Sequence, residues 1–402
     1  MSAPFLRLNE VELAGRRVFL RADFNVPLSD DGGVADDSRI RATLPGIRDC
    51  LARGASLAIA SHLGRPTAGR LGPHESLAPV ARRLSELLGR PVPLVKEWRS
   101  RDFAPPFGEV VMLENCRGNA GETADDPLLA ERLARYVDVY VNDAFGTAHR
   151  KECTLSALAK AAPMACAGPL LAAELDALGR ALAAPRRPLA AIVGGSKVST
   201  KLAVLERLAE QVDLLIVGGG IANTFIAAQG HDVGASLFEA ELLASARRIS
   251  ERLAQRGARL WLPTDVVCAD HFGADAEIRV CTLDQVPSGW MILDVGPDSQ
   301  AALTPALADC GTVVWNGPLG VFELDPFAAG TRALAAAIAA SPAFSIAGGG
   351  DTLAAIARFD VADGLDMIST GGGAFLEFLE GRTLPAIAAL LEARRNAAGA
   401  TV

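Results

Sequence analysis

The sequence predicts an α/β protein with two domains, each a parallel sheet lying between layers of helices. Short runs rich in Val and Ile alternate along the chain with Ala- and Leu-rich stretches of helical character. Strands that alternate with helices form parallel sheets with helices on both faces. The chain has 402 residues, half of them hydrophobic, which is long for a single core and sufficient for two.

Most of the expected strands are bounded by Gly, Asn, Asp or Pro, and helical patterns such as 76–89 and 201–212 lie between them. The strands are expected at 16–24, 56–64, 109–115, 138–145, 189–195, 213–220, 258–267, 312–318 and 343–350. In such sheets the ligand lies at the carboxyl ends of the strands. Unusual polar residues lie at or near the carboxyl ends of five of these runs, namely His62, Asn142, Lys197, Asn316 and Asp351.

Residues 162–190 differ in sequence pattern from the segments around them and separate the two halves of the chain. We expect a helix around 169–184 that ends in the Pro-Arg-Arg-Pro sequence at 185–188. Proline cannot continue a helix, so this sequence marks its end. The segment is interpreted as the connector between the two α/β domains.

Composition excludes several classes of function. The net charge is −8, which disfavours sequence-independent binding to nucleic acid, because such binding needs a basic face. The seven cysteines are dispersed and form no CxxC pair, as expected for reduced thiols rather than a disulfide framework or a zinc site. Glu10 and Glu12 lie where a signal peptide would be apolar, and no apolar run reaches about 18 residues. A cytoplasmic protein without a membrane partner is expected.

The stretch IVGGSKVSTKL, residues 192–202, has the character of a phosphate-binding loop. It is not a Walker A loop, because the chain contains no Gly-Lys dipeptide, and no glycine cluster fits the GxGxxG dinucleotide fingerprint. The chain has five lysines and 34 arginines, yet Lys197 and Lys201 lie four residues apart here. We infer that both positions require a compact ammonium group, which the planar guanidinium does not replace.

Four glycine-rich loops in the second half each begin a helix-like segment. They lie at 194–197, 218–223, 348–353 and 371–376. Glycine lets the backbone approach a ligand, and the N–H groups at a helix start bind anions, so the group of loops indicates a polyphosphate ligand. Asp351 and Thr352 open one of these helices. A carboxylate beside phosphates favours Mg²⁺, which prefers oxygen ligands.

The first half carries a different set of polar residues near its expected strand ends. It comprises Asp23, Asn25, Arg39, His62, Arg65, Arg117, His149 and Arg150. Arginine binds carboxylate and phosphate in a bidentate manner. Several arginines with one or two histidines are therefore typical of a site for a small, multiply anionic substrate.

These segments resemble the phosphoglycerate kinase family from about residue 8 to residue 385. The most specific are RVFLRADFNVP, DDSRIRATLP, SHLGRP, NDAFGTAHR, GGSKVSTKL, WNGPLGVFE, GGGDT and STGGGAFLEFLEG, which occur in the family's order. The resemblance implies two Rossmann-like, three-layer (αβα) domains joined by a hinge helix. The N-terminal domain would be 1–168 with 386–402 returning to it, the hinge helix and linker 169–188, and the C-terminal nucleotide-binding domain 189–385.

The resemblance also implies the reaction and the residues that serve it. The enzyme would transfer a phosphoryl group reversibly between ATP and 3-phosphoglycerate with Mg²⁺, as a cytoplasmic monomer in glycolysis, gluconeogenesis or carbon fixation. The acid would be bound by Asp23, Asn25, Arg39, His62, Arg65, Arg117 and Arg150. The nucleotide would be bound by Lys197, Lys201, Gly219, Gly296, Asn316, Glu323, Gly350, Asp351, Thr352, Gly371, Gly372 and Gly373. Arg39, Lys197 and Lys201 are the expected catalytic residues, Glu323 the ribose ligand and Asp351 the magnesium ligand.

Two departures from the family pattern stand out. Gly118 follows Arg117 where family members usually have an aromatic residue, and residues 151–155 read KECTL where many members are closer to AHAST. Two alternatives remain open, a related phosphotransferase for another small acid and a nucleotide-binding module on the same scaffold. The module would not need Arg39, His62, Arg65, Arg117 and Arg150.

Overall fold

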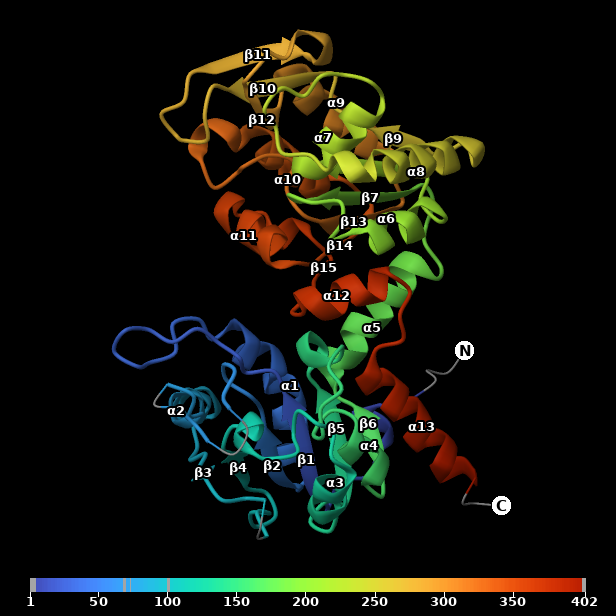
Figure 1. Ribbon diagram of the computed structural model, residues 1–402. Coiled ribbons are helices and arrows are strands. Elements are labelled where there is room, and N and C mark those ends of the chain that lie inside the picture. Colours follow the sequence, from blue (N-terminus) through green and yellow to red (C-terminus); the bar gives the residue numbers. More distant parts are fainter. Residues whose placement is uncertain (1–4, 68–69, 73, 100–101, 400–402) are drawn as a thin grey trace. The chain divides into compact units, whose positions relative to one another are not determined.

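The computed structural model describes residues 5–67, 70–72, 74–99 and 102–399. The chain forms two compact units. Unit 1 comprises Met1–Leu175 and Thr383–Val402, and unit 2 comprises Asp176–Arg382. The boundary falls inside helix α5 (Pro169–Leu182), which therefore contributes to both units (Figure 1). Within the described part of the chain, no helix is both long and apolar enough to cross a membrane.

Unit 1 is built on a six-stranded sheet in the order β3-β4-β2-β1-β5-β6, in which every neighbouring pair is parallel. The strands are β1 (Arg17–Ala22), β2 (Ser56–Ala60), β3 (Leu94–Val95), β4 (Val110–Leu113), β5 (Val139–Asp143) and β6 (Ala165–Ala167). Alternate residues of β1 enter different cores. Val18 and Leu20 join a large aliphatic cluster, whereas Phe19 packs against the rings of Trp98 and Tyr140. The sheet is thus covered on both faces, as parallel sheets are.

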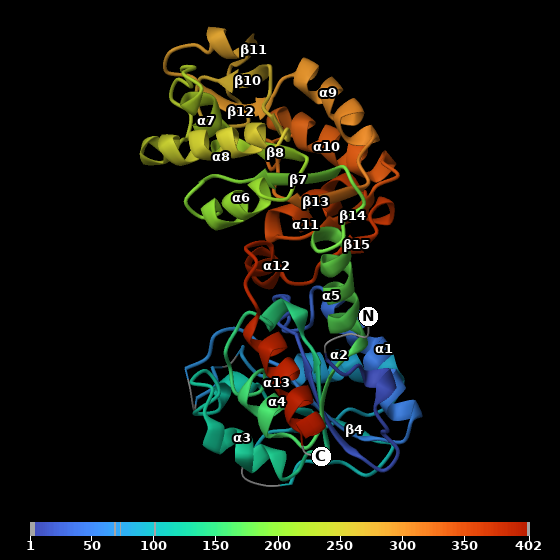
Figure 2. The same cartoon turned by 90° about the vertical axis from the view of Figure 1, so that its right-hand side faces the viewer.

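The helices of unit 1 begin and end at recognisable signals. They are α1 (Ser38–Ala52), α2 (Ala78–Leu88), α3 (Pro127–Ala134), α4 (Ala157–Ala161) and α13 (Pro385–Gly399), with the first part of α5. Asp126 accepts a hydrogen bond from the backbone N–H of Leu128 and caps α3, and Gly89 ends α2 with a left-handed φ of 65°. The C-terminal helix α13 packs against α4 and β6, as Figures 1 and 2 show.

Unit 2 contains a second six-stranded parallel sheet, in the order β15-β14-β13-β7-β8-β9. Its strands are β7 (Leu189–Gly194), β8 (Leu214–Gly218), β9 (Arg259–Trp261), β13 (Thr312–Asn316), β14 (Phe344–Ala347) and β15 (Met367–Ile368). Its helices, besides the end of α5, are α6 (Leu202–Ala209), α7 (Gly219–Ala228), α8 (Leu243–Gln255), α9 (Pro297–Ala308), α10 (Ala329–Ala340), α11 (Gly350–Phe359) and α12 (Gly372–Leu379). The predicted α/β class with parallel sheets is confirmed.

One part of unit 2 differs from the expectation. The run 258–267, expected as a single strand, divides into β9 and β10 (Asp265–Ala269) on either side of Pro263. A proline cannot donate to a sheet ladder and separates the two strands. β10 then pairs antiparallel with β11 (Ile278–Thr282) and β12 (Met291–Val295) in a small three-stranded sheet that the sequence analysis did not foresee.

Two glycines at strand ends allow a close backbone crossing in unit 2. Gly194 ends β7 and Gly218 ends β8, and the two are register partners. A Cβ atom at Gly194 would lie 1.8 Å from the carbonyl oxygen of Pro318, and one at Gly218 would lie 2.4 Å from the same oxygen. The loop after β13 therefore passes directly over both strand ends, and no larger residue fits there.

This crossing predicts opposite effects of the same substitution at two glycines. Gly194→Ala forces the backbone apart and should destabilise the protein by about 3 kcal/mol or abolish folding of unit 2. Gly179→Ala, inside α5 with no atom within 4 Å of its added Cβ, should be neutral or stabilise by up to about 1 kcal/mol. Urea denaturation of both variants measures the difference. Equal stability of the two would contradict the role given to the crossing.

Candidate active site

The polar residues of unit 1 lie at the carboxyl ends of four adjacent strands. Arg117 follows β4, His62 follows β2, Asp23 follows β1 and Arg150 follows β5. Parallel strands end at the same edge of a sheet, so residues more than 100 positions apart converge there. The sheet order β4-β2-β1-β5 thereby builds one polar cluster, which we call the unit 1 cluster.

Asp23 fixes Arg39 in this cluster. Arg39 is in the first turn of α1, and its Nη1 donates to Asp23 Oδ2 over 2.8 Å. The Asp23 side chain is 9% exposed and that of Arg39 is 35% exposed, so the guanidinium is held from the protein side and remains open to solvent. Asn25 is engaged with the backbone, because its Oδ1 accepts a hydrogen bond from Gly64 N at 2.9 Å.

His62 is a neutral residue in the centre of the unit 1 cluster. Its pKa is well below the usual value because the side chain is buried and because positive charges surround it. These charges belong to Arg21, Arg117, Arg150 and Arg39. Each of these positive charges lowers the pKa of His62 in addition to the effect of burial. Such a concentration of positive charge suits a ligand with more than one negative charge.

The remaining arginines differ in how firmly they are held. Arg117 is buried, and its guanidinium contacts Glu152 and the carbonyl oxygen of Gly64. The side chain of Arg65 is exposed and that of Arg150 is partly exposed, and neither donates a hydrogen bond to another residue that the structure describes. These two are therefore available to an incoming anion.

Four residues that support the unit 1 cluster escaped the sequence analysis. They are Arg21, Glu122, Glu152 and Thr154. Arg21 is fully buried within β1, and its Nε donates to Thr154 Oγ1 at 2.9 Å. Thr154 Oγ1 in turn donates to Glu122 Oε1 at 2.6 Å. Two signals in the sequence pointed to this buried network, namely a charged residue inside the apolar run VFLRADF and the unusual segment 151–155.

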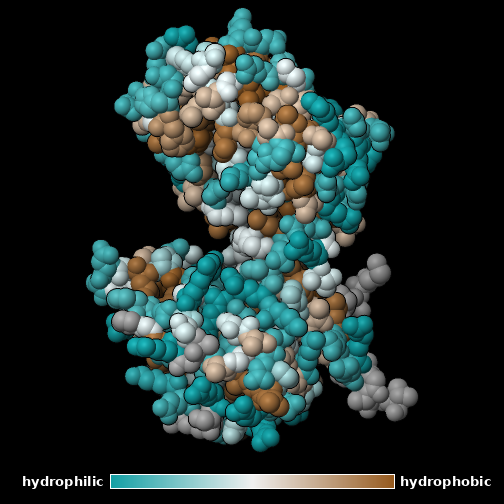
Figure 3. Space-filling view, viewed as in Figure 1, coloured by the Kyte–Doolittle hydropathy of each residue, from teal (hydrophilic) through white to brown (hydrophobic). Residues whose placement is uncertain are grey.

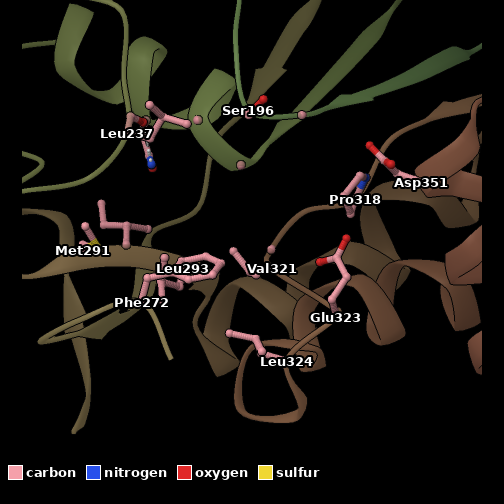
Figure 4. Close-up of a pocket in the computed structure, with 16 residues that line it drawn as sticks. Ser196, Leu237, Phe272, Met291, Leu293, Pro318, Val321, Glu323, Leu324 and Asp351 are labelled. Carbon is pink, nitrogen blue, oxygen red and sulfur yellow. Dashed lines mark hydrogen bonds between the residues drawn. The ribbon is translucent and has the colours of Figure 1, made fainter. Parts of the chain in front are cut away.

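Unit 2 contains a cavity of about 510 Å³ above the ends of β7 and β8. Figure 4 shows that its two ends differ in character. The carboxylates of Glu323 and Asp351 lie at one end, and hydrophobic side chains line the other, namely Leu237, Phe272, Met291 and Leu293. Phe272 and Leu237 are 63% and 52% exposed, and Figure 3 shows hydrophobic side chains on the visible surface of this unit. Such a cavity suits a ligand with an apolar ring and a polar tail.

Lys201 is anchored beside this cavity. Its Nζ lies 2.6 Å from both Gly194 O and Asn316 Oδ1 and donates to these acceptors. Burial lowers the pKa of Lys201 to about 8, while the negative charge of Asp351 acts in the opposite direction. Lys197 is exposed, and its ammonium donates to no other described residue, so it is free to reach a bound anion.

Several residues that were expected to bind the nucleotide hold the loops around the cavity and do not line it. Asn316 Nδ2 donates to Gly348 O at 2.7 Å, and Thr352 Oγ1 accepts from Gly317 N at 2.8 Å. Of the residues expected to bind nucleotide, Gly219, Glu323 and Asp351 line the cavity. Gly296 does not, because it caps α9, where an added Cβ would lie 2.2 Å from an oxygen of Asp265.

Three helices of unit 2 begin in glycine-rich loops. Gly219 starts α7, Gly350 starts α11, and Gly371 precedes Gly372 and Gly373 at the start of α12. A Cβ at Gly372 would lie 3.5 Å from the Cα of Gly349, so the starts of α11 and α12 adjoin. Their free N–H groups favour bound anions.

Asp351 suits a magnesium ion held together with phosphates. It is exposed in the first turn of α11 and lines the cavity. The described residues contain no cluster of three or more His, Cys, Asp or Glu that could hold a metal ion. Mg²⁺ commonly takes only one or two carboxylates and completes its shell with phosphate oxygens and water, so a single carboxylate fits this ion.

Comparison with known proteins identifies the family of the chain. The sequence model described as phosphoglycerate kinase matches residues 8–382. The chain belongs to the phosphoglycerate kinase family. The structure of phosphoglycerate kinase from Coxiella burnetii is 48% identical with a TM-score of 0.93, over 98% of this chain and 100% of that one. Phosphoglycerate kinase from Pyrococcus horikoshii OT3 is 33% identical with a TM-score of 0.80, over 97% and 99% of the two chains.

The lowered pKa of Lys201 predicts how nucleotide affinity depends on pH in this kinase. Phosphate favours the charged ammonium, which in the free protein is fully present well below pH 8 and is lost as the pH rises through about 8. ATP affinity should therefore fall above pH 8, with a limiting slope of about tenfold per pH unit.

Calorimetric titration with ATP between pH 7 and 9.5 measures this dependence. The Lys201→Met variant should bind more weakly and lose the decline. An affinity of the wild-type protein that stays constant up to pH 9.5 would contradict the assignment of Lys201 to the phosphates.

Proposed function

We propose that this protein catalyses reversible phosphoryl transfer between ATP and the carboxylate of 3-phosphoglycerate, giving ADP and 1,3-bisphosphoglycerate. The observation that carries the proposal beyond family membership is the unit 1 cluster. A nucleotide-binding module has no use for Arg39, Arg117 and Arg150 near a neutral histidine. A small acid that carries both a phosphate and a carboxylate accounts for them.

The reaction needs no general base. A carboxylate has a pKa near 4 and is already ionised at neutral pH, so its oxygen can attack the γ-phosphorus directly. A new P–O bond forms as the bond to the β–γ bridging oxygen breaks, and the electron pair leaves with ADP. The protein supplies position and positive charge for the transferred group. The neutral state of His62 is consistent with a hydrogen-bonding role on the acid rather than with proton transfer.

The residues divide into two groups in this proposal. Asp23, Asn25, Arg39, His62, Arg65, Arg117 and Arg150 bind the acid. Lys197 and the helix starts at Gly219, Gly350 and Gly371–Gly373 bind phosphates, Glu323 accepts from the ribose hydroxyls, and Asn316 and Thr352 hold the surrounding loops. Arg39 and Lys201 place positive charge on the transferred group. Asp351 would hold Mg²⁺, which neutralises phosphate charge when bound.

The decisive assay measures ADP formation from ATP and 3-phosphoglycerate with Mg²⁺, while a coupled dehydrogenase removes the acyl phosphate. A parallel sample contains EDTA. Rapid turnover that requires Mg²⁺ would support the proposal. A panel of other small acids tests the alternative substrate, and turnover with one of them but not with 3-phosphoglycerate would replace the proposed function.

Removal of the positively charged side chain of Lys201 or of Arg39 should abolish most of the activity and leave the fold intact. Lys201→Ala and Arg39→Ala should each lower kcat by about 10²–10³-fold, the usual cost of losing a fixed charge in a water-poor site. Arg41→Ala and Lys160→Ala are matched controls, because these side chains pair with Asp37 and Glu392, which are not assigned to the site. A kcat near that of the wild type in either site variant would refute the role of that residue.

The two substrates are assigned to different domains, 1–168 with 386–402 for the acid and 189–385 for the nucleotide. Transfer requires reacting atoms about 3–3.5 Å apart, so the doubly liganded protein must bring the two ligands together. Residues 169–188 would carry this motion. Small-angle scattering should show a smaller radius of gyration with both ligands than with either alone. Identical profiles would contradict hinge closure.

A further inference from the structure

The two departures from the family pattern meet at Arg117. Gly118 directly follows this arginine, and Glu152 belongs to the segment 151–155. The Glu152 carboxylate accepts hydrogen bonds from Arg117, with Oε1 2.8 Å from Nη2 and 3.1 Å from Nε. Both side chains are only 6% exposed, so this ion pair is buried. The substituted segment is therefore in direct contact with a residue of the acid site.

Glu152 occupies one edge of the guanidinium. Its carboxylate takes the Nε–H and one N–H of Nη2, while Nη1 donates to Gly64 O at 3.1 Å. Arginine has five N–H bonds in a rigid fork. One N–H on Nη1 and one on Nη2 thus donate to no other residue that the structure describes. These two bonds are left for an anion.

Gly118 offers no side chain to support Arg117. A Cβ at this position would lie 2.6 Å from Leu71 Cδ2, so Leu71 already fills the space beside it. An aromatic ring at position 118 would require Leu71 to move. The side chain of Arg117 is held by Glu152 and Gly64, and its backbone N–H by Asn115 Oδ1 at 3.1 Å.

Glu152 is itself fixed between two arginines. Arg21 Nη2 lies 3.9 Å from Glu152 Oε2, the oxygen that also accepts a hydrogen bond from Arg117 Nε at 3.4 Å. The Arg21 side chain is fully buried, and its Nε is tied to Thr154. A buried carboxylate is tolerated only when it is paired, and here both neighbours are cations. A carboxylate locked in this way can fix the orientation of Arg117.

We infer that Glu152 is the positioning residue for Arg117 in the acid site. This inference rests on the proposed function, because it concerns how the arginine meets 3-phosphoglycerate. An arginine ordered before binding loses less side-chain freedom when the acid arrives. The opposite possibility is that Glu152 competes with the acid for Arg117, and the two possibilities predict opposite changes in KM.

The test compares Glu152→Gln, which keeps the side-chain size, with Glu152→Ala. Each should raise the KM for 3-phosphoglycerate about 10- to 100-fold, with a smaller change in kcat and an unchanged KM for ATP. Glu152→Asp, which retains the carboxylate, should recover part of the affinity. Lys151→Ala is the matched control, because the neighbouring lysine side chain is 73% exposed.

A second set of variants distinguishes a positioning role of Glu152 toward Arg117 from an effect of Glu152 on the stability of the whole protein. If Glu152 acts through Arg117, Arg117→Ala should also raise the KM for the acid, and adding Glu152→Gln to it should have little further effect. A merely structural role would lower Tm and change the KM values of both substrates. An unchanged or lower KM for the acid in Glu152→Gln, or additive effects in the double variant, would overturn the inference.

The inference and the proposed function fail in different ways. If the wild-type protein does not use 3-phosphoglycerate, the proposed function fails before any variant is made. Calorimetric titration with inorganic phosphate then still tests Glu152, because Arg117 would hold an anion of any acid substrate. Weaker phosphate binding in Glu152→Gln than in the wild type supports the inference, and equal or tighter binding overturns it.

Discussion

Parallel strand pairing places the carboxyl ends of all strands at one edge of a sheet, and the polar chemistry of both units depends on this constraint. In unit 1, Asp23, His62, Arg117 and Arg150 converge because their four strands are neighbours. In unit 2, the helices that begin at Gly219 and Gly350 follow β8 and β14, whose ends lie at the same edge. The apolar strand residues are buried in the cores, and the polar residues just beyond them gather at the edge of the sheet, where ligands bind in such folds.

Some of the cationic side chains at these edges are held in place by one or two hydrogen-bond partners, and others are not. Asp23 holds Arg39, Glu152 holds Arg117, and carbonyl and amide oxygens of Gly194 and Asn316 hold Lys201. Arg65, Arg150 and Lys197 have no such partners among the described residues. Each unit therefore combines fixed cations with adaptable ones. Fixed charges need no reorganisation during reaction, whereas the adaptable ones can follow an anion as it enters.

The glycines have two different physical roles that look alike in the sequence. Gly194 and Gly218 are required because another backbone crosses them, and an added Cβ would overlap Pro318 O. Gly350 has no atom within 4 Å of an added Cβ, so packing does not require glycine there. Its role is to leave the start of α11 exposed. Both kinds were predicted as phosphate loops. The distinction depends on Pro318, which is 100 or more residues away in the sequence, so a local pattern does not reveal it.

The sequence by itself determined the alternation of strands and helices, the helix near 169–184 and the polar residues that follow the strands, because these follow from local periodicity and from short motifs. Tertiary structure alone decided the antiparallel sheet of β10, β11 and β12, the hydrophobic wall with Phe272 and Leu293, and the pairing of Glu152 with Arg117. Apolar residues that line a cavity have the same pattern as those of a core. A buried ion pair between residues 35 positions apart depends on which strands become neighbours, and that choice is made by packing of the whole sheet rather than by any one segment.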